Sequence, residues 1–351
     1  MDKELSISDW RDCENYPLPG WCNRHTTLFD VETATLSALP VGIDVAVCSV
    51  SFDSTASSRI GARDGPAAIR KASHVYANQF ASREIGVFRN MQTGLLHEIT
   101  PRKIVDFGDL HVFPTSTQLQ VEATRAEIFR LASSGATVVL LGGEHMLTYP
   151  AFHGVYNAFQ QRSSNARLGY LHIDNHFDFG MSSMLHGPFY HGSNSRRISE
   201  IPGVDLGSMA FVGVGDFTSA SQYDQLIAAG ICIEPMWRVR EIGFGEALKR
   251  SIETCLSRCD ALYVSIDIDV CDTAVTSGTG HVTVGGITAI DFLSIAAIIQ
   301  DYPIAALDIM EVNPNLEWSN VAAHLSSRLL FEWLVMRRRH DNIAAQGGAN
   351  G

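Results

Sequence analysis

Residues 168–178 read LGYLHIDNHFD, an apolar run that passes directly into alternating acidic and imidazole side chains. Asp174, His176 and Asp178 stand at i, i+2 and i+4, so in extended chain they point to the same side. Burying such a set at the end of an apolar strand costs free energy unless a counter-charge is present. The pattern therefore predicts a buried strand at 168–173 that ends in a cation site.

Short apolar runs of the same kind recur along the chain and alternate with helical patterns. Such runs are typical of strands buried on both faces, as in parallel sheets. We expect strands at 45–50, 137–141, 168–173, 209–213, 262–266 and 304–307. We expect helices from Gly65-Pro66 onward and at 117–132, 245–256, 289–300 and 321–336. The alternating order predicts one α/β domain of three layers, α/β/α, with a mostly parallel central sheet.

The two ends of the chain differ from this alternating region. Residues 1–40 contain three prolines and several aromatic residues, and we expect an ordered N-terminal extension that forms an oligomer contact. Residues 41–340 form the predicted α/β domain. We expect residues 341–351 (DNIAAQGGANG) to form a flexible tail, because they are small and polar.

Two more of the apolar runs end in residues of metal-ligand types. The run TVVLL is followed by GGEH at 142–145, whose glycines let the chain turn and present His145 at the strand end. A later run ends in Asp267 and Asp269, which are i, i+2 on one face. Two carboxylates this close, between Ile and Val residues, cannot both ionise readily without a cation. Because ligands bind beyond the carboxyl ends of strands in open α/β sheets, we expect all three clusters to meet.

The combined cluster contains two histidines and four aspartates: His145, Asp174, His176, Asp178, Asp267 and Asp269. Oxygen-rich ligation with imidazole favours Mn²⁺, with Ni²⁺, Co²⁺, Fe²⁺ and Zn²⁺ as alternatives. Six side chains exceed one tetrahedral site, so two ions that share bridging carboxylates fit the count better. Two such ions can hold a hydroxide that is nucleophilic at neutral pH. His172 falls on the same face but deeper in the strand, and we interpret it as a hydrogen-bonded core histidine.

Composition excludes several classes of protein. The chain of 351 residues is 46% apolar and has a formal charge of −12, which disfavours nucleic-acid binding and favours cations. No stretch of ~20 apolar residues could span a bilayer. Seven scattered cysteines and an N-terminus without an apolar signal region lead us to expect a cytoplasmic protein.

Taken in order along the chain, these and further motifs resemble the ureohydrolases, the arginase and agmatinase group. The similarity runs from about residue 40 to 340. Beyond GGEH, DNHFD and SIDIDVCD, the matching motifs are GARDGP at 61–66 with Ile69-Arg70, DFGD at 106–109, His191-Gly192, SGTG at 277–280 and DIMEVNP at 308–314. The family implies an arginase-like fold, a centre of two metal ions, usually Mn²⁺, and hydrolysis of a guanidino group to urea and an amine. Residues 41–340 would then be a ureohydrolase catalytic domain that acts on C–N bonds of linear amidines.

The resemblance also implies roles for individual residues. The implied ligands are His145, Asp174, Asp178 and Asp267 for one ion, and Asp174, His176, Asp267 and Asp269 for the other. Glu311 would hold the substrate guanidinium, because a planar guanidinium pairs well with a carboxylate. His191 would relay protons, since it lies thirteen residues after Asp178, which is the family spacing; His186-Gly187 is a competing pair. The implied reaction is attack on the guanidinium carbon by metal-activated water, with protons passing through Asp178 and His191.

Two stretches depart from the family pattern. The usual GGDHS reads GGEHM at 142–146, and the usual DAHxD reads DNHFD at 174–178. The ligands survive but their neighbours change, so Ni²⁺ is the main alternative to Mn²⁺. The loop before His191 reads FGMSSMLHGPFY at 179–190 and offers no Arg or Lys to pair with an α-carboxylate. We therefore expect a small cationic guanidino substrate, namely agmatine, guanidine or an alkyl-substituted guanidine or biguanide, and not arginine.

Two other functions stay open at this point. The changed neighbours of the ligands would also suit a ureohydrolase-like subunit whose activity needs a partner chain. A deacetylase of related fold keeps one metal site, whereas this sequence completes two. The family forms trimers and hexamers, so the resemblance implies a homo- or hetero-oligomer.

Overall fold

The computed structural model describes residues 26–80 and 86–339. Within them, the central sheet has nine strands, all parallel to their neighbours. Their order across the sheet is β1 (Glu32–Thr33), β5 (Ile104–Asp109), β2 (Val45–Val50), β6 (Thr137–Gly142), β11 (Ile304–Met310), β10 (Ala261–Asp267), β7 (Leu168–Ile173), β8 (Met209–Val212) and β9 (Cys232–Glu234). A smaller antiparallel sheet joins β12 (Met336–Arg338), β4 (Leu96–Ile99) and β3 (Val87–Arg89).

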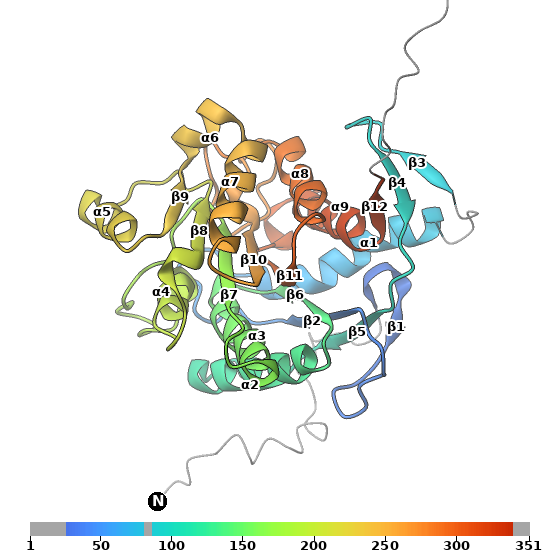
Figure 1. Cartoon of the computed structure of the whole chain (residues 1–351), viewed down its shortest axis with the longest axis horizontal. Helices are drawn as coiled ribbons and strands as arrows, with labels where there is room; N and C mark the ends of the chain where they lie inside the picture. The colour runs from blue at the N-terminus through green and yellow to red at the C-terminus, as the bar shows by residue number, and fades with distance from the viewer. Residues whose placement is uncertain (1–25, 81–85, 340–351) are drawn as a thin grey trace, which may run out of the picture.

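Helices cover both faces of the central sheet (Figure 1). They are α1 (Gly65–Phe80), α2 (Thr117–Ser133), α3 (Thr148–Arg162), α4 (Asn194–Ser199), α5 (Ala220–Ala228), α6 (Met236–Ile242), α7 (Phe244–Leu256), α8 (Ala289–Ile299) and α9 (Val321–Leu334). This arrangement confirms the predicted three-layer α/β/α fold with a parallel central sheet.

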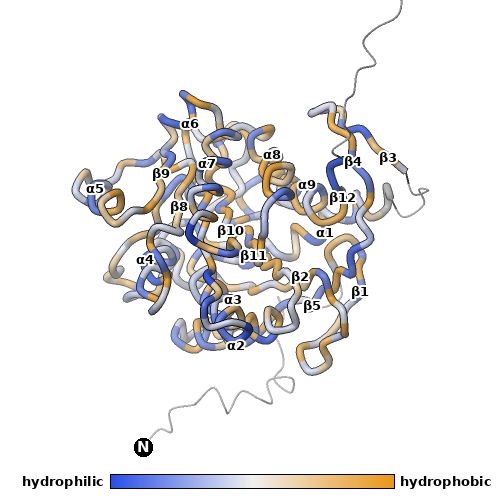
Figure 2. The backbone as a smooth tube through the Cα atoms, in the orientation of Figure 1, coloured by the Kyte–Doolittle hydropathy of each residue, from blue (hydrophilic) through white to orange (hydrophobic). Residues whose placement is uncertain are grey.

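Successive residues of each central strand face opposite layers, which buries both faces of the sheet. In β2, Val45 and Val47 pack into the core that contains the apolar sides of α1, α7, α8 and α9. Ala46 and Cys48 pack into a second core, against α2 and α3. Figure 2 shows the resulting apolar stretches along the strands at the centre of the molecule.

Several elements differ from the sequence-based expectation. The helix expected at 321–336 ends at Leu334, and Met336 begins β12, where it pairs with Ile99 of β4. The elements that were not predicted include β5 and α3. Strand β5 contains two aspartates, which interrupt its apolar pattern. Helix α3 contains a proline in its first turn and Gly154, at which a Cβ atom would lie 2.6 Å from the Arg125 carbonyl oxygen of α2. The close contact between α2 and α3 therefore requires glycine at position 154. Glycine has a low helix propensity, so it weakens the sequence pattern that would predict α3.

The two predicted end segments differ in how much of them the structure describes. Of the predicted N-terminal extension, residues 26–40 are described, and the predicted tail at 341–351 lies outside the described residues. The oligomer contact stays a prediction. Across the described ranges, none of the helices has the length and apolarity that crossing a bilayer requires.

Candidate metal centre

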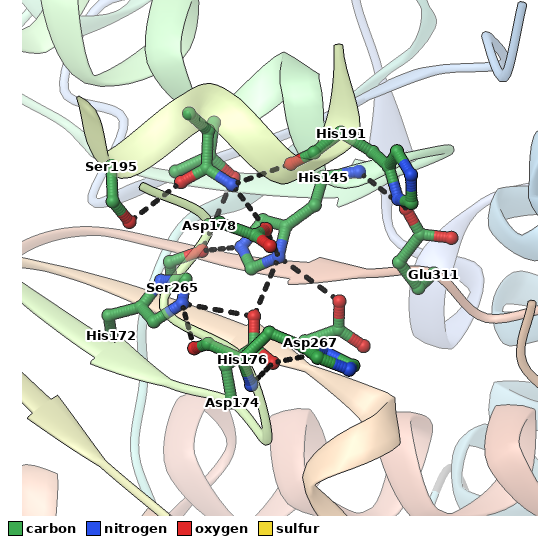
Figure 3. Close-up of polar contacts among 12 residues, drawn as sticks. His145, His172, Asp174, His176, Asp178, His191, Ser195, Ser265, Asp267 and Glu311 are labelled. Carbon is green, nitrogen blue, oxygen red and sulfur yellow. Dashed lines mark hydrogen bonds and ion pairs between the residues drawn. The ribbon is translucent and has the colours of Figure 1, made fainter. Parts of the chain in front are cut away.

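Three chain segments at the carboxyl edge of the central sheet bring the predicted metal ligands together. Strands β6, β7 and β10 run parallel, so their carboxyl ends lie at one edge of the sheet. His145 follows β6, the ligands of the DNHFD segment follow β7, and Asp267 is the last residue of β10 with Asp269 two residues on. Figure 3 shows five of the six side chains converging on one region, together with His191 and Glu311.

The first ligand group is centred on His145. Its Nδ1 lies 3.1 Å from a carboxylate oxygen of each of three aspartates, Asp174, Asp178 and Asp267. One imidazole N–H cannot point at three oxygens at once. Ligand atoms held about 2.1 Å from one ion at right angles are about 3.0 Å apart. The observed spacing agrees with donors that could surround a cation.

The second ligand group is centred on His176. Its Nδ1 lies 3.3 Å from Asp174 Oδ1 and 3.2 Å from Asp269 Oδ2. Asp174 thus belongs to both groups, with one carboxylate oxygen facing each, and it is placed to bridge two ions. Asp267 Oδ1 accepts a hydrogen bond from the Asp269 backbone N–H at 2.8 Å. A bridging role for Asp267 stays a prediction.

The cluster holds more buried negative charge than the surrounding chain neutralises. Burial, followed by the charges of Asp269 and Asp174, raises the pKa of Asp267 well above its usual range. Burial and the Asp174 carboxylate raise the pKa of Asp269 to about 7. Three buried atoms of the cluster that could bind a metal ion have no hydrogen-bond partner: His145 Nδ1, Asp174 Oδ2 and Asp269 Oδ1. Divalent cations would satisfy these atoms and charges, so the residues fit the predicted ions.

The orientation of His145 depends on two residues that sequence reasoning did not assign. Its Nε2 lies 2.8 Å from Ser265 Oγ, and Ser265 donates to Asp308 Oδ1 at 2.6 Å. Thr148 and Tyr263 donate to Asp308 Oδ2. Such partners hold the other imidazole nitrogen toward the metal position. The available signal was the aspartate inside the apolar run that forms β11.

Two residues of the site have backbone conformations that cost free energy. Asp178 has φ 46° and Glu311 has φ 63°, in the left-handed region that non-glycine residues rarely adopt. Backbone hydrogen bonds hold both: the Asp178 carbonyl accepts from Ser195 N–H at 3.1 Å, and Glu311 N–H donates to the Gly143 carbonyl at 2.9 Å. Strain of this kind is concentrated at functional sites, where the surrounding structure imposes it.

His172 has a partner on each ring nitrogen. Its Nδ1 lies 2.7 Å from the Tyr170 hydroxyl, and its Nε2 lies 3.2 Å from the His176 carbonyl oxygen. A carbonyl oxygen only accepts, so Nε2 carries the proton and has no lone pair for an ion. This geometry agrees with a core histidine, whose Nε2 also lies 3.0 Å from Asp174 Oδ2 of the first group.

Glu311 and His191 lie beside the ligand groups (Figure 3). Glu311 Oε1 accepts from the His145 backbone N–H at 2.8 Å and lies 3.8 Å from His191 Nδ1. Burial raises the pKa of Glu311 to about 8 and lowers the pKa of His191 to about 4. His186, the competing histidine, lies on the preceding loop and joins neither ligand group within the described residues.

The changed neighbours of the ligands have defined contacts. Glu144, in place of the family's aspartate, is fully buried and accepts hydrogen bonds from both the backbone N–H and the hydroxyl of Thr55. Asn175 Nδ2 lies 3.4 Å from His176 Nε2. Phe177 is buried edge-on against Phe211. Glu144 and Phe177 thus connect the two loops that carry predicted ligands to Thr55 and Phe211, which lie in segments without predicted ligands.

A cavity of about 260 Å³ borders the second ligand group. Its lining includes the predicted ligands His176 and Asp178, the carboxylate of Asp216, and four aromatic residues: Phe177, Phe179, Tyr190 and Phe217. No lysine or arginine is among its described lining residues. The cavity therefore offers aromatic and acidic contacts to a bound molecule, which suit a cation or an apolar group.

Comparisons with known proteins agree with this geometry. The family model described as "Arginase family" matches residues 43–336. A human mitochondrial guanidino acid hydrolase is 26% identical over 322 residues, which cover 91% of this chain and 85% of the relative. A chicken (Gallus gallus) mitochondrial agmatinase is 28% identical over 314 residues, covering 87% and 86%. The structure of proclavaminate amidino hydrolase from Streptomyces clavuligerus superposes with a TM-score of 0.70 at 23% identity, covering 90% of this chain and 99% of the other.

Proposed function

The chain belongs to the arginase family, and from that premise we propose that it hydrolyses a guanidino compound to urea and an amine at a centre of two divalent ions. One observation carries the proposal: two groups of donor atoms, spaced at 3.1–3.3 Å and sharing Asp174, lie beside the buried carboxylate of Glu311. Mn²⁺ is the expected metal and Ni²⁺ the main alternative.

The ligand groups define which residues would hold the ions. His145, Asp174, Asp178 and Asp267 would hold one, and Asp174, His176, Asp267 and Asp269 the other. When bound, the ions would supply Lewis acidity and an activated water at neutral pH.

The remaining residues of the site would bind and orient the substrate and move protons. Glu311 would pair with the guanidinium, and the backbone N–H of His145 already fixes one of its oxygens. Asp178, whose Oδ2 accepts from Asn194 Nδ2 at 2.7 Å, would pass a proton to the leaving amine. His191 would exchange that proton with solvent. Oriented attack on the bound guanidinium would supply much of the rate.

The lining of the cavity supports a substrate without a carboxylate. A buried carboxylate would have no cationic side chain to pair with there, whereas Asp216 and the aromatic rings suit an alkyl or cationic group. Agmatine, guanidine and alkyl-substituted guanidines or biguanides meet this condition. The two relatives named above differ on this point, since one is called a guanidino acid hydrolase and the other an agmatinase.

A urea-release screen tests the proposal. The purified chain, stripped of metal and reloaded with Mn²⁺ or with Ni²⁺, is offered arginine, 4-guanidinobutyrate, agmatine, guanidine and dimethylguanidine. We expect urea from one or more of the last three and little from the two carboxylates. Metal analysis is expected to find two ions per chain; one ion per chain would favour the deacetylase-like alternative. Arginine or 4-guanidinobutyrate as the best substrate would contradict the substrate proposal.

The alternative, a subunit that needs a partner chain, is favoured by a specific observation. Loops at the carboxyl edge of the sheet carry large apolar side chains that are fully exposed: Met184, Phe217 and Trp318. Large apolar side chains exposed on loops suit contacts with another chain. A chain that is inactive alone but active after mixing with a second ureohydrolase-like chain would support this alternative.

A further inference from the structure

A third histidine, His281, lies against the two histidines of the site that have partly exposed rings. Its ring stacks on that of His191, with centroids 5.4 Å apart and an interplanar angle of 22°. It meets the ring of the ligand His176 edge-on, with centroids 5.8 Å apart and an angle of 73°. His281 directly follows the SGTG motif at 277–280.

The segment that carries His281 is held by hydrogen bonds from other parts of the chain. Arg59 donates from Nε to the Gly280 carbonyl at 3.0 Å and from Nη2 to the Thr279 carbonyl at 3.1 Å. Asn313 N–H donates to the Gly278 carbonyl at 2.7 Å. These hydrogen bonds fix the backbone just before His281. They therefore also fix the position from which its ring reaches the ring of His191.

His191 itself has a polar partner near each ring nitrogen. The backbone N–H and the hydroxyl of Ser57 approach Nε2 at 3.3 and 2.7 Å. A backbone N–H can only donate, so Nε2 accepts, and the neutral ring carries its proton on Nδ1. Nδ1 faces Glu311 Oε1 at 3.8 Å. The ring must keep its plane for both nitrogens to face these partners.

We propose that His281 is a positioning residue for His191: its stacked ring holds the His191 imidazole in the plane that directs Nδ1 to Glu311 and Nε2 to Ser57. The inference rests on the proposed function, because it gives His191 a role in proton transfer. Offset stacking of aromatic rings is favourable and directional, which suits this task. A phenylalanine at position 281 can keep the stack without any ring nitrogen, so stacking and proton transfer by His281 itself are separable.

A set of variants of the metal-loaded enzyme tests the proposal by kinetics, using the best substrate of the urea-release screen. His281→Ala is expected to lower kcat about tenfold with KM nearly unchanged, while His281→Phe keeps most of the activity. In a His191→Ala background, His281→Ala is expected to cause no further loss, because it acts through His191. His324→Ala, an exposed histidine on α9, is the matched control and should behave as wild type. Independent, additive losses from the two substitutions would overturn the proposal, as would a His281→Phe variant as impaired as His281→Ala.

A measurement without substrate separates failure of this inference from failure of the proposed function. Diethyl pyrocarbonate acylates exposed neutral imidazoles, and peptide mass mapping reports the rate at His191. His281→Ala is expected to raise that rate several-fold in protein that still binds its metal, and His281→Phe is expected to leave it near wild type. An unchanged rate in His281→Ala would refute the stacked contact. Absence of urea release by wild type would contradict the proposed function and leave this result standing.

Discussion

Two clusters of buried carboxylates lie in the central sheet, and they differ in where their positive charge comes from. Asp106 and Asp109 of β5 face Arg70 of α1, whose side chain is fully buried. Arg70 donates from Nε and Nη2 to the two oxygens of Asp106 at 2.9 Å each, and from Nη1 to Ser49 Oγ at 2.7 Å. The chain thus supplies the cation for these aspartates itself.

The aspartates at the carboxyl ends of β7 and β10 have no such arginine partner among the described residues. Their charged neighbours among the described residues are imidazoles and other carboxylates, and three of the donor atoms have no hydrogen bond. We call the cluster of Asp106, Asp109 and Arg70 the closed cluster, because its cation belongs to the chain and stabilises the fold. We call the aspartates and histidines beyond β7 and β10 the open cluster, because an external cation would balance their charge. Buried carboxylates with a structural role therefore have a cation from the chain, whereas those that would bind metal lack one. Substitutions in each cluster test this difference.

The largest expected effect is on stability, from the closed cluster. Arg70→Met leaves Asp106 and Asp109 buried and uncompensated, so the free energy of unfolding should fall by about 3–5 kcal/mol. Urea denaturation of the metal-free protein measures it. Arg167→Met, at an exposed position, is the control and should change stability little. A loss of under about 1 kcal/mol in Arg70→Met would show that this cluster does not depend on its internal cation.

The second effect is on activity, from the open cluster. Asp174→Asn removes the carboxylate shared by both groups, so urea release should fall more than about 100-fold and bound metal should drop below two ions per chain. In the metal-free protein the imidazole of His172, with those of His145 and His176, holds the pKa of Asp174 well below its usual range. Removing this carboxylate should therefore also lower stability, and the loss of bound metal is what distinguishes Asp174→Asn from Arg70→Met. Asp224→Asn on α5 is the exposed control. Unchanged metal content in Asp174→Asn would contradict the assigned ligand groups.

A smaller effect is expected from the residue that orients His145. Ser265→Ala removes the hydroxyl between His145 Nε2 and Asp308, so metal affinity should fall about tenfold while the fold is retained. Competition with a chelator measures the affinity, and Ser257→Ala, which removes an exposed hydroxyl, serves as the control. Equal affinities for the two variants would mean that His145 needs no such partner.

The smallest effect is a pH dependence of the metal-free protein. Burial raises the pKa of Asp269 to about 7 and that of Glu311 to about 8, above their values in an unfolded chain. Through these two groups the folded state binds more protons than the unfolded state between about pH 4 and pH 8. Stability falls as pH rises through that window, so the Tm of chelator-treated protein should be lower at pH 8.5 than at pH 6. Metal loading should weaken or reverse this trend, because ligands bind ions in the deprotonated form. A Tm of the chelated protein that rises with pH would contradict the open-cluster interpretation.

Much of the fold followed from local patterns, and the exceptions have physical causes. The strands at 45–50 and 168–173 have the predicted bounds, because short apolar runs between turns are typical of strands buried on both faces. Strand β5 escaped prediction because its two aspartates are neutralised by Arg70 of α1, a residue distant in sequence. Helix α3 escaped because Gly154 is needed where α2 approaches, a requirement that no local pattern expresses.

The sequence by itself determined which side chains could bind metal. Asp174, His176, Asp178, Asp267 and Asp269 stand at the ends of apolar runs, and ligands bind beyond the carboxyl ends of the strands that such runs form. The extended chain expected for these residues is not found, because residues 174–176 lie in bends and Ile268–Val270 form a 3-10 helix. Only the tertiary structure decided which of these donors meet, and which side chains support them. Ser57, Ser265 and His281 reach the site from separate segments, and their contacts with His191 and His145 exist because strand order and loop packing bring those segments together. Such contacts leave no periodic signal in the sequence, because the residues involved are 90 or more positions from their partners.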